Sequence, residues 1–228
     1  MKAIILAGGL GTRLQGVVKD LPKPMAPING RPFLEILVNK LKQSSITDIV
    51  LAVGYRRECI QDYFGNGANW GVTINYSIEA TQLGTGGAIK LAMERFYAER
   101  YLIMNGDSFF ENDLPELVLY HQAKKALITM ALAEVSDTDR YGAVKLDADG
   151  MITHFTEKGV TGRGAVNAGV YVLERETMNF FSKDACSFET DVLQGMVGLR
   201  LFGLKQHGFF TDIGIPEDYH VFCQYRQR

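Results

Sequence analysis

The sequence predicts an α/β protein whose sheet is mixed but mostly parallel and is flanked by helices. In the first half, short apolar runs typical of buried strands alternate with amphipathic stretches of helical length. In the second half, short strand-like runs follow one another closely, which favours mixed or antiparallel pairing there. The two halves therefore contribute differently to one three-layer architecture.

The first half supplies four apolar runs that fit buried parallel strands, at residues 2–6, 49–53, 72–76 and 101–104. Two stretches between them carry apolar residues at helical spacing. The clearer one contains Phe33, Leu34, Leu37, Val38 and Leu41, and the weaker one Ile89, Leu91, Ala92 and Phe96. This β-α-β-α rhythm predicts right-handed crossovers with helices on both faces.

The second half supplies strand-like runs at residues 127–133, 142–146, 151–155 and 165–173. The segment 147–150, Asp-Ala-Asp-Gly, predicts a hairpin turn between two of them. Ser187 fits a helix N-cap, with acidic residues in the following turn. Pro216 suits the first turn of a last helix that runs to about Tyr225.

Composition limits the range of functions. The chain has 228 residues, 46% hydrophobic and 22% charged, with a formal net charge of −2, so we expect neither nucleic acid nor an anionic membrane as a partner. The three cysteines are far apart, which argues against a disulfide framework or a zinc site. No signal peptide or run of roughly 20 apolar residues is present, so a cytoplasmic location is the default expectation. We expect one domain, residues 1–228, with lobes at about 1–125 and 126–228.

A glycine-rich loop directly after the first strand is the most informative segment. Residues 6–14 read Leu-Ala-Gly-Gly-Leu-Gly-Thr-Arg-Leu. The glycines let backbone N–H groups approach an anion, and Arg13 offers a fixed fork for phosphate oxygens. Glycines alone fit a plain tight turn equally well. Neither a P-loop nor a complete dinucleotide-binding fingerprint is present.

Lys23 stands between two prolines in the segment Leu-Pro-Lys-Pro-Met, residues 21–25. The prolines hold the backbone extended, so less entropy is lost when the lysine is ordered against a phosphate. An exposed surface turn is the alternative. Arg13 and Lys23 can both face the carboxyl edge of the sheet, where open α/β sheets bind ligands.

The combination of residues 8–14 with Pro22-Lys23-Pro24 resembles the signature of the sugar-1-phosphate nucleotidyltransferases. Further matching segments extend over nearly the whole chain: residues 83–88, 105–107, 157–158, 167–169 and 212–216. The resemblance implies a Rossmann-like fold, the nucleotide-diphospho-sugar transferase fold. It also implies a reaction in which a sugar phosphate oxygen attacks the α-phosphorus of a nucleoside triphosphate and pyrophosphate leaves. Such catalysis is positioning plus charge neutralisation.

The resemblance assigns roles residue by residue. Arg13 and Lys23 are the catalytic cations. Nucleotide binding falls to Leu6, Ala7, Gly8, Gly9, Gly11, Thr12, Gln82, Gly84, Thr85 and Gly106. The small residues at 83–88 would read the base, although Thr85-Gly86-Gly87 also fits a plain helix start. Asp107 and Asp212 would hold Mg²⁺, whose preferred ligands are oxygens, while a turn role remains the alternative for Asp107.

The sugar side is assigned by resemblance to Glu157, Lys158, Asn167 and Gly169. The carboxylate would accept bonds from sugar hydroxyls and the ammonium would hold the sugar phosphate. Taken without the resemblance, Glu157 and Lys158 read as an exposed ion pair of little energetic worth, and Asn167 as a turn residue at a strand end. The four histidines are expected to be structural or exposed.

Within the family, the chain most resembles guanylyltransferases that make GDP-heptose from GTP and D-glycero-α-D-manno-heptose 1-phosphate for bacterial surface polysaccharides. Residues 17–29, 139–142, 187–189 and 212–219 carry this likeness. A uridylyl-, thymidylyl- or cytidylyltransferase, or a silent nucleotide-sugar-binding subunit, stays open as an alternative. We expect no C-terminal β-helix domain. A homodimer contact could use Phe180, Phe181, Leu199, Leu201 and Phe202, although core packing is the commoner fate of such residues.

Overall fold

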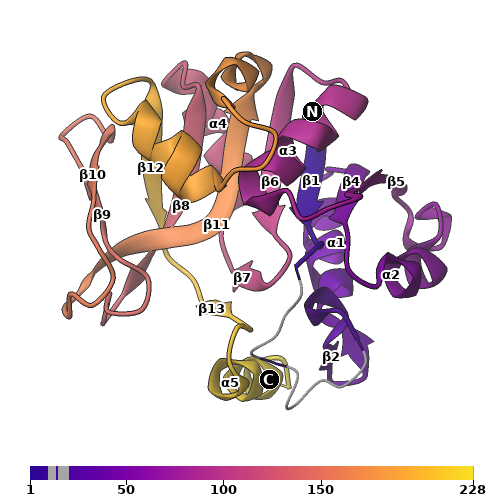
Figure 1. Ribbon diagram of the computed structural model, residues 1–228. Coiled ribbons are helices and arrows are strands. Elements are labelled where there is room, and N and C mark those ends of the chain that lie inside the picture. The colour runs from indigo at the N-terminus through magenta and orange to yellow at the C-terminus, as the bar shows by residue number, and fades with distance from the viewer. Residues whose placement is uncertain (10–13, 15–20, 228) are drawn as a thin grey trace.

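The computed structural model describes residues 1–9, 14 and 21–227, and its centre is a seven-stranded sheet (Figure 1). The strand order is β12-β8-β11-β6-β1-β4-β5. The predicted mixed, mostly parallel sheet is confirmed, and it runs without interruption through both halves of the chain. The glycine-loop residues Gly11, Thr12 and Arg13 lie outside the described residues.

The first half forms the parallel part of the sheet. Its strands are β1 (Lys2–Leu6), β4 (Asp48–Val53), β5 (Thr73–Ile78) and β6 (Arg100–Asn105). β1 lies between β4 and β6 and is parallel to both. The four predicted apolar runs are confirmed as strands. β1, β4 and β6 are buried on both faces, the environment that gives parallel strands their continuous apolar sequence, whereas β5 stands at the sheet edge and is partly buried.

Helices cover both faces of this sheet, as the three-layer prediction requires. Ala3 and Ile5 of β1 face the core under α1 (Phe33–Gln43), while Ile4 faces the core under α3 (Gly84–Arg95). The helices α2 (Arg57–Phe64), α4 (Leu114–Ala123) and α5 (Pro216–Tyr225) add their buried residues to the α1 side. α5 begins at Pro216 and ends at Tyr225, which confirms the predicted last helix.

The second half adds the mixed part. β11 (Gly164–Glu174) is antiparallel to β6 on one side and to β8 (Ile128–Val135) on the other, and β12 (Leu201–Gln206) is parallel to β8. The hairpin of β9 (Val144–Leu146) and β10 (Ile152–Phe155) projects beside them (Figure 1). Its predicted turn is confirmed, since the Gly150 amide donates to the Asp147 carbonyl at 3.2 Å.

Short elements complete the description. β2 (Pro27–Ile28) pairs with β3 (Arg31–Pro32), and β7 (Ser108–Phe110) pairs with β13 (Phe210–Asp212). Single 3-10 turns occupy residues 23–25, 68–70, 175–180 and 194–196, and a π-helical turn spans residues 188–193. The Ser187 hydroxyl accepts from the Thr190 amide at 3.3 Å, so the predicted N-cap is confirmed.

Four of the five apolar residues considered for a dimer contact pack into the core. Phe181, Leu201 and Phe202 are buried, Phe180 packs partly against them, and only Leu199 of the five is exposed. The cysteines 59, 186 and 223 are free thiols, as expected. Over the described part of the chain, no helix has the length and apolarity needed to cross a membrane.

Candidate active site

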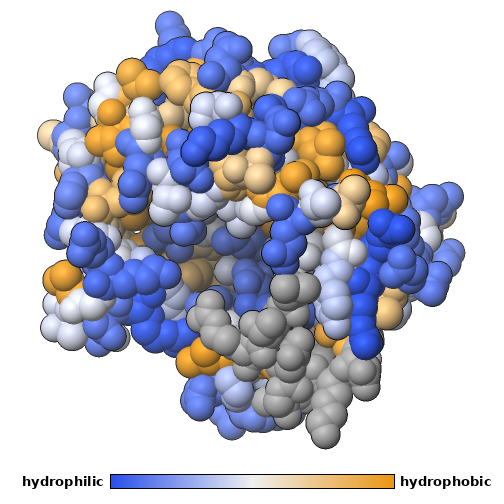
Figure 2. Space-filling model, in the orientation of Figure 1, coloured by the Kyte–Doolittle hydropathy of each residue, from blue (hydrophilic) through white to orange (hydrophobic). Residues whose placement is uncertain are grey.

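A cavity of about 490 Å³ opens at the carboxyl ends of β1 and β6. In the space-filling view this face of the molecule is hollowed near its middle (Figure 2). The cavity is lined by Leu6, Gly8, Gly9, Lys23, Pro24, Glu79, Gln82, Gly84, Thr85, Ala88, Asn105, Gly106, Asp107 and Gly214. Most of the nucleotide-binding residues expected from the sequence are therefore brought together here, at the sheet edge where α/β proteins bind ligands.

The described part of the glycine loop packs closely against neighbouring segments of the chain. A Cβ on Gly8 would stand 2.7 Å from Glu79 Oε1 and 3.2 Å from the Gly54 nitrogen. Gly9 has no neighbour that close and faces the cavity. Ala7 is buried and donates its amide to the Ala52 carbonyl at 2.7 Å, so it fixes the loop and does not line the cavity.

Lys23 and Asp107 meet inside the cavity. Lys23 lies in a single 3-10 turn that Pro22 closes by accepting the Met25 amide at 2.8 Å. Its ammonium donates to Asp107 Oδ2 at 2.7 Å. The Lys23 side chain is mostly buried, whereas that of Asp107 is 42% exposed. A cation and a carboxylate from distant parts of the sequence thus face one ligand-sized space.

Asp212 joins this pair through the β7–β13 ribbon. The Ile213 amide donates to the Asp107 carbonyl at 2.8 Å, which sets the two aspartates side by side along the ribbon. A Cβ on Gly214 would lie 2.5 Å from Asp212 Oδ1 and 3.4 Å from Lys23 Nζ. The absence of a side chain at Gly214 therefore lets the aspartate and the lysine approach each other.

The Asp212 carboxylate has polar neighbours on several sides. Its Oδ1 accepts the Gly214 amide at 2.7 Å, and its Oδ2 lies 3.6 Å from an Arg140 nitrogen. Burial, with help from the nearby Asp212 charge, raises the pKa of Tyr141 to about 12. Tyr141 therefore stays neutral beside this carboxylate at physiological pH.

The two aspartates suit a divalent cation that takes its remaining ligands from elsewhere. Among the described residues, no group of three or more His, Cys, Asp or Glu side chains could enclose a metal by itself. Two carboxylates at an open cavity match the way Mg²⁺ is bound in phosphate enzymes, with phosphate oxygens and waters completing the shell. The donor set is thus compatible with a metal that arrives with a nucleotide.

The start of α3 forms one wall of the cavity. Gly84 has φ +69°, and with Thr85 it lines the cavity. The glycines that follow serve packing: a Cβ on Gly87 would lie 2.1 Å from the Asp184 carbonyl oxygen, and one on Gly86 2.6 Å from Cys186 Sγ. The Thr85 hydroxyl accepts the Phe188 amide at 2.9 Å. The helix-start interpretation therefore explains Gly86 and Gly87.

Glu79 is a site residue that the sequence analysis missed. It follows β5 and lines the cavity, where its Oε2 accepts the Leu83 amide at 3.3 Å. Burial raises its pKa above the ordinary value, and the bond from Leu83 partly opposes this shift. A carboxylate after a predicted strand, at the carboxyl edge of the sheet, was the available signal.

The expected sugar-side residues divide into two groups. Gly169 lies against Asn105 of β6, a cavity-lining residue, because a Cβ there would stand 2.7 Å from Asn105 Nδ2, although the lining itself includes neither Gly169 nor Asn167. Asn167 Oδ1 accepts the Gly169 amide at 3.0 Å, within the β11 bulge. Glu157 and Lys158 are exposed in the loop after β10, and the cavity lining does not include them.

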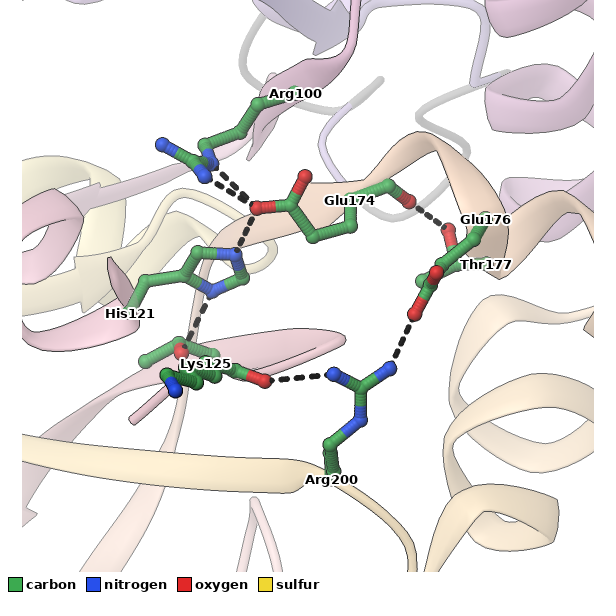
Figure 3. Close-up of polar contacts among 8 residues, drawn as sticks. Arg100, His121, Lys125, Glu174, Glu176, Thr177 and Arg200 are labelled. Carbon is green, nitrogen blue, oxygen red and sulfur yellow. Dashed lines mark hydrogen bonds and ion pairs between the residues drawn. The ribbon is translucent and has the colours of Figure 1, made fainter. Parts of the chain in front are cut away.

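A separate cavity of about 380 Å³ lies at the opposite edge of the sheet and has a different character. Two of its cations pair with carboxylates of the same cavity, Arg100 with Glu174 and Arg200 with Glu176 (Figure 3). His121 also contacts Glu174, at 3.1 Å. Because this cavity lies away from the carboxyl ends of the strands and from the glycine loop, the carboxyl-edge cavity remains the better candidate for phosphate chemistry.

Comparison with known proteins agrees with the assignment of phosphate chemistry to this cavity. The family model described as "Nucleotidyl transferase" matches residues 2–226.

The chain belongs to the nucleotidyl transferase family.

This nucleotidyl transferase has close relatives of nearly equal length. It is 43% identical to the D-glycero-alpha-D-manno-heptose 1-phosphate guanylyltransferase of Campylobacter jejuni, over 97% of this chain and 98% of that one. It is 42% identical to the enzyme of the same name from Aneurinibacillus thermoaerophilus, over 96% and 95%. Among solved structures, HddC from Yersinia pseudotuberculosis complexed with GMP-PN matches with a TM-score of 0.87 and 35% identity, over 99% of both chains. The predicted family and fold are confirmed.

Proposed function

We propose that this protein transfers a guanylyl group from GTP to D-glycero-α-D-manno-heptose 1-phosphate and releases GDP-heptose and pyrophosphate. The observation that carries the proposal is the 43% and 42% identity, over nearly whole chains, to two enzymes of that name. The cavity that joins Lys23 and Asp107 with the glycine loop supports the chemistry. The product would feed bacterial surface glycan synthesis. Because the substrates are cytoplasmic metabolites, a cytoplasmic location is part of the proposal.

The chain's own residues act by position and charge. The sugar phosphate oxygen attacks the α-phosphorus, and pyrophosphate leaves in line, so negative charge grows on the departing group. Lys23 lies at the cavity wall and would hold the α-phosphate region, while Arg13, Gly11 and Thr12 would hold the outer phosphates. These cations neutralise charge without forming a covalent bond to the substrate.

Mg²⁺ is the cofactor we propose for Asp107 and Asp212. When bound, it would neutralise charge on the triphosphate oxygens. The two carboxylates, whose segments are joined through the β7–β13 ribbon, would provide hard oxygen ligands. Before the metal arrives, the Lys23 ammonium partly neutralises Asp107 at 2.7 Å.

The two lobes would divide the substrates between them. Residues of about 1–125, which include Gly8, Gly9 and Gln82, would bind the nucleotide, and residues of about 126–228 would bind the sugar phosphate. Gly169 lies against Asn105 of the cavity lining, and Asn167 accepts the Gly169 amide, which supports this division. Glu157 and Lys158 would reach the sugar from the loop after β10.

Glu79 is the residue we propose for choosing guanine. Guanine presents two adjacent donors on its Watson–Crick edge, the N1–H and the exocyclic amine, and an ionised carboxylate is an acceptor-only group that matches both. Glu79 lines the cavity beside Gln82 and the start of α3. Adenine presents an acceptor at N1, so it would leave this half-buried charge poorly paired.

The first experiment measures pyrophosphate release with Mg²⁺ and each of GTP, UTP, dTTP, CTP and ATP, paired with a panel of sugar 1-phosphates that includes the heptose phosphate. Turnover confined to GTP and the heptose phosphate is the expected result. Efficient turnover with a different pair would retain the nucleotidyl transfer and discard the heptose proposal. Silence across the panel would favour a nucleotide-sugar-binding subunit.

Base selection is tested separately with inosine triphosphate, which lacks the exocyclic amine. We expect GTP to exceed it in kcat/KM on the order of tenfold or more, because a hydrogen bond to a charged partner contributes about 1.5–3 kcal/mol. Glu79→Gln should remove most of this preference. Glu94→Gln, an exposed substitution on α3, is the control and should retain it. An unchanged preference in Glu79→Gln would assign the base to other residues.

A further inference from the structure

Arg140 stands in the loop between β8 and β9, and this loop is fastened to the loop that carries Glu157 and Lys158. The Thr138 hydroxyl donates to the Val160 carbonyl at 2.8 Å, and the Gly159 amide donates to the Asp139 carbonyl at 2.8 Å. We call residues 136–143 and 156–162 together the loop pair. Because these bonds connect the two loops directly, a displacement of one displaces the other.

A close backbone approach tightens the same connection. Gly142 has φ +75°, and a Cβ there would stand 2.5 Å from the Thr156 carbonyl oxygen. The Ala143 amide donates to the Thr156 hydroxyl at 2.7 Å. The position of Glu157 and Lys158 therefore depends on where the first loop is held.

Arg140 holds the first loop against the C-terminal segment. One guanidinium nitrogen lies 2.6 Å from Asp218 Oδ2 in the first turn of α5, and another lies 3.6 Å from Asp212 Oδ2. Both aspartates are about four-fifths buried, so this contact is shielded more than an ordinary surface ion pair. The guanidinium also lies over the Tyr141 ring, which packs edge-on against Phe210 of β13.

The two aspartates have different places in the molecule. Asp212 ends β13, two residues before the cavity-lining Gly214, whereas Asp218 belongs to α5; the cavity lining includes neither aspartate. The shorter contact is to Asp218, so α5 anchors the guanidinium and leaves its other nitrogen directed at Asp212. A lysine would hold the two carboxylates less firmly, because the planar guanidinium faces them with two separate nitrogens in fixed directions.

We propose that Arg140 is a positioning residue for the sugar phosphate: through Asp218 and Asp212 it fixes the loop pair against the C-terminal segment and so sets where Glu157 and Lys158 stand. The inference rests on the proposed function insofar as those two residues serve the sugar side. It explains why the loop pair is bonded to the C-terminal segment although its exposed residues, Glu157 and Lys158, do not line the cavity. Arg140 needs no contact with the reacting atoms in this role.

The kinetic test compares Arg140→Ala, Arg140→Lys and Asp218→Asn with the wild type, using whichever substrate pair is turned over. We expect Arg140→Ala and Asp218→Asn to raise KM for the sugar phosphate about tenfold, which corresponds to about 1.4 kcal/mol. KM for the nucleotide should change less than twofold. Arg140→Lys should lie between the wild type and Arg140→Ala. The variant that combines Arg140→Ala with Asp218→Asn should have the same KM for the sugar phosphate as Arg140→Ala alone, because both substitutions remove the same Arg140–Asp218 contact.

Arg163→Ala is the matched control. Arg163 lies just beyond the loop pair, is 80% exposed and has only a 4.0 Å contact with Glu134, so its loss should leave both KM values unchanged. Equal losses for nucleotide and sugar phosphate in Arg140→Ala, or no change in either, would overturn the proposal.

Hydrogen exchange supplies a readout that needs no substrate. In Arg140→Ala and Asp218→Asn, amides of residues 137–143 and 157–162 should exchange several-fold faster, while the central strands β1 and β6 stay protected. Unchanged exchange in the loop pair would overturn the positioning role even if the enzyme is active. Faster exchange in a protein that turns over no tested substrate would support Arg140 as the fastening and count against the proposed function alone.

Discussion

At the scale of single residues, the proposed nucleotidyl transfer depends most on the contact between Lys23 and Asp107. Lys23 is held by a proline turn and is mostly buried, so its ammonium has little freedom to leave the cavity. Asp107 is more exposed, and under the proposed function it would exchange this partner for a metal. In the proposed reaction this contact would be the arrangement before the triphosphate binds.

Replacing Lys23 with alanine tests the cation. We expect kcat to fall by about 10²–10³, the usual loss when one preorganised donor to a developing charge is removed. The fold should survive, because Asp107 remains in contact with solvent. Steady-state kinetics and a urea unfolding curve give the two answers. Lys145→Ala on the distant β9 is the control, and near-normal kcat/KM in Lys23→Ala would remove Lys23 from the mechanism.

Replacing Asp107 with asparagine tests the metal. The amide preserves the size of the side chain but removes a negative charge, so we expect lower activity and a higher Mg²⁺ concentration at half-maximal rate. A magnesium titration of pyrophosphate release measures both effects. Asp62→Asn, an exposed change on α2, should leave the titration unaltered. If Asp107→Asn gave the wild-type titration curve, the metal would have to bind elsewhere.

At the scale of elements, the start of α3 shows how packing and ligand binding share one segment. Gly84 and Thr85 line the cavity, while the next two glycines pack closely against residues 184–188. The Gly86 amide donates to the Cys186 carbonyl at 2.9 Å, which joins the helix start to that segment. Residues of the two halves are thus fastened together directly behind the cavity wall.

Gly87→Ala tests this close approach. In an ordinary helix interior, alanine is more stable than glycine by about 1 kcal/mol. At Gly87 the new methyl group would stand 2.1 Å from the Asp184 carbonyl oxygen, so we expect a loss of about 1–3 kcal/mol in the free energy of unfolding. Urea denaturation measures it. Gly195→Ala has no atom within 4 Å of the new Cβ and serves as the control; a Gly87→Ala variant as stable as this control would contradict the packing account.

The elements differ in how well their sequences predicted them. The buried strands of the first half were predictable because continuous apolar runs leave few alternatives. β7 and β13 have three residues each, too few for any periodicity, and the Gly203 position weakened the pattern of β12. α4 was missed although its signal was present: Asp113 caps the helix by accepting the Glu116 amide at 2.9 Å, the pattern of a capping sequence.

At the scale of the whole molecule, the sheet order explains which site residues could be predicted. Parallel β1 and β6 end at the same edge, so Gly9 and Asp107 converge once their strands are identified. The pairing of β13 with β7 brings Asp212 close to Asp107. The place of Asp212 in the site was expected only by resemblance. The place of Glu79 in the cavity could have been predicted, since it follows a predicted strand, whereas the distance of Glu157 from the cavity depends on tertiary packing, for which a local sequence pattern carries no information.

The opposite edge of the sheet is closed by a buried polar network that links α4, β8, β11 and β6 (Figure 3). The His121 ring is fully buried. Its Nδ1 lies 2.9 Å from the Thr129 hydroxyl and its Nε2 3.1 Å from Glu174 Oε1, which also accepts from Arg100 at 2.7 Å. A carboxylate only accepts, so Nε2–H donates to Glu174 and Nδ1 accepts from Thr129 in the neutral ring.

This network should make the stability of the whole fold sensitive to acid. Burial lowers the pKa of His121 below its ordinary value of 6.5, with Glu174 opposing and Arg100 reinforcing the shift. Between the lowered pKa and 6.5, the unfolded chain binds a proton that the folded protein does not. The free energy of unfolding should therefore fall as the pH drops below 6.5, by at most about 1.4 kcal/mol per pH unit from this one group.

Urea unfolding at pH 5, 6 and 7 measures the dependence, and His121→Gln isolates the histidine contribution. Glutamine can still donate to Glu174 but cannot bind a proton, so the variant should be less stable at pH 7 and should show a smaller loss toward pH 5. His154→Gln replaces an exposed histidine of β10 and should retain the wild-type slope. A His121→Gln variant with that same slope would mean that other groups, such as the carboxylates paired in the native fold, account for the acid sensitivity.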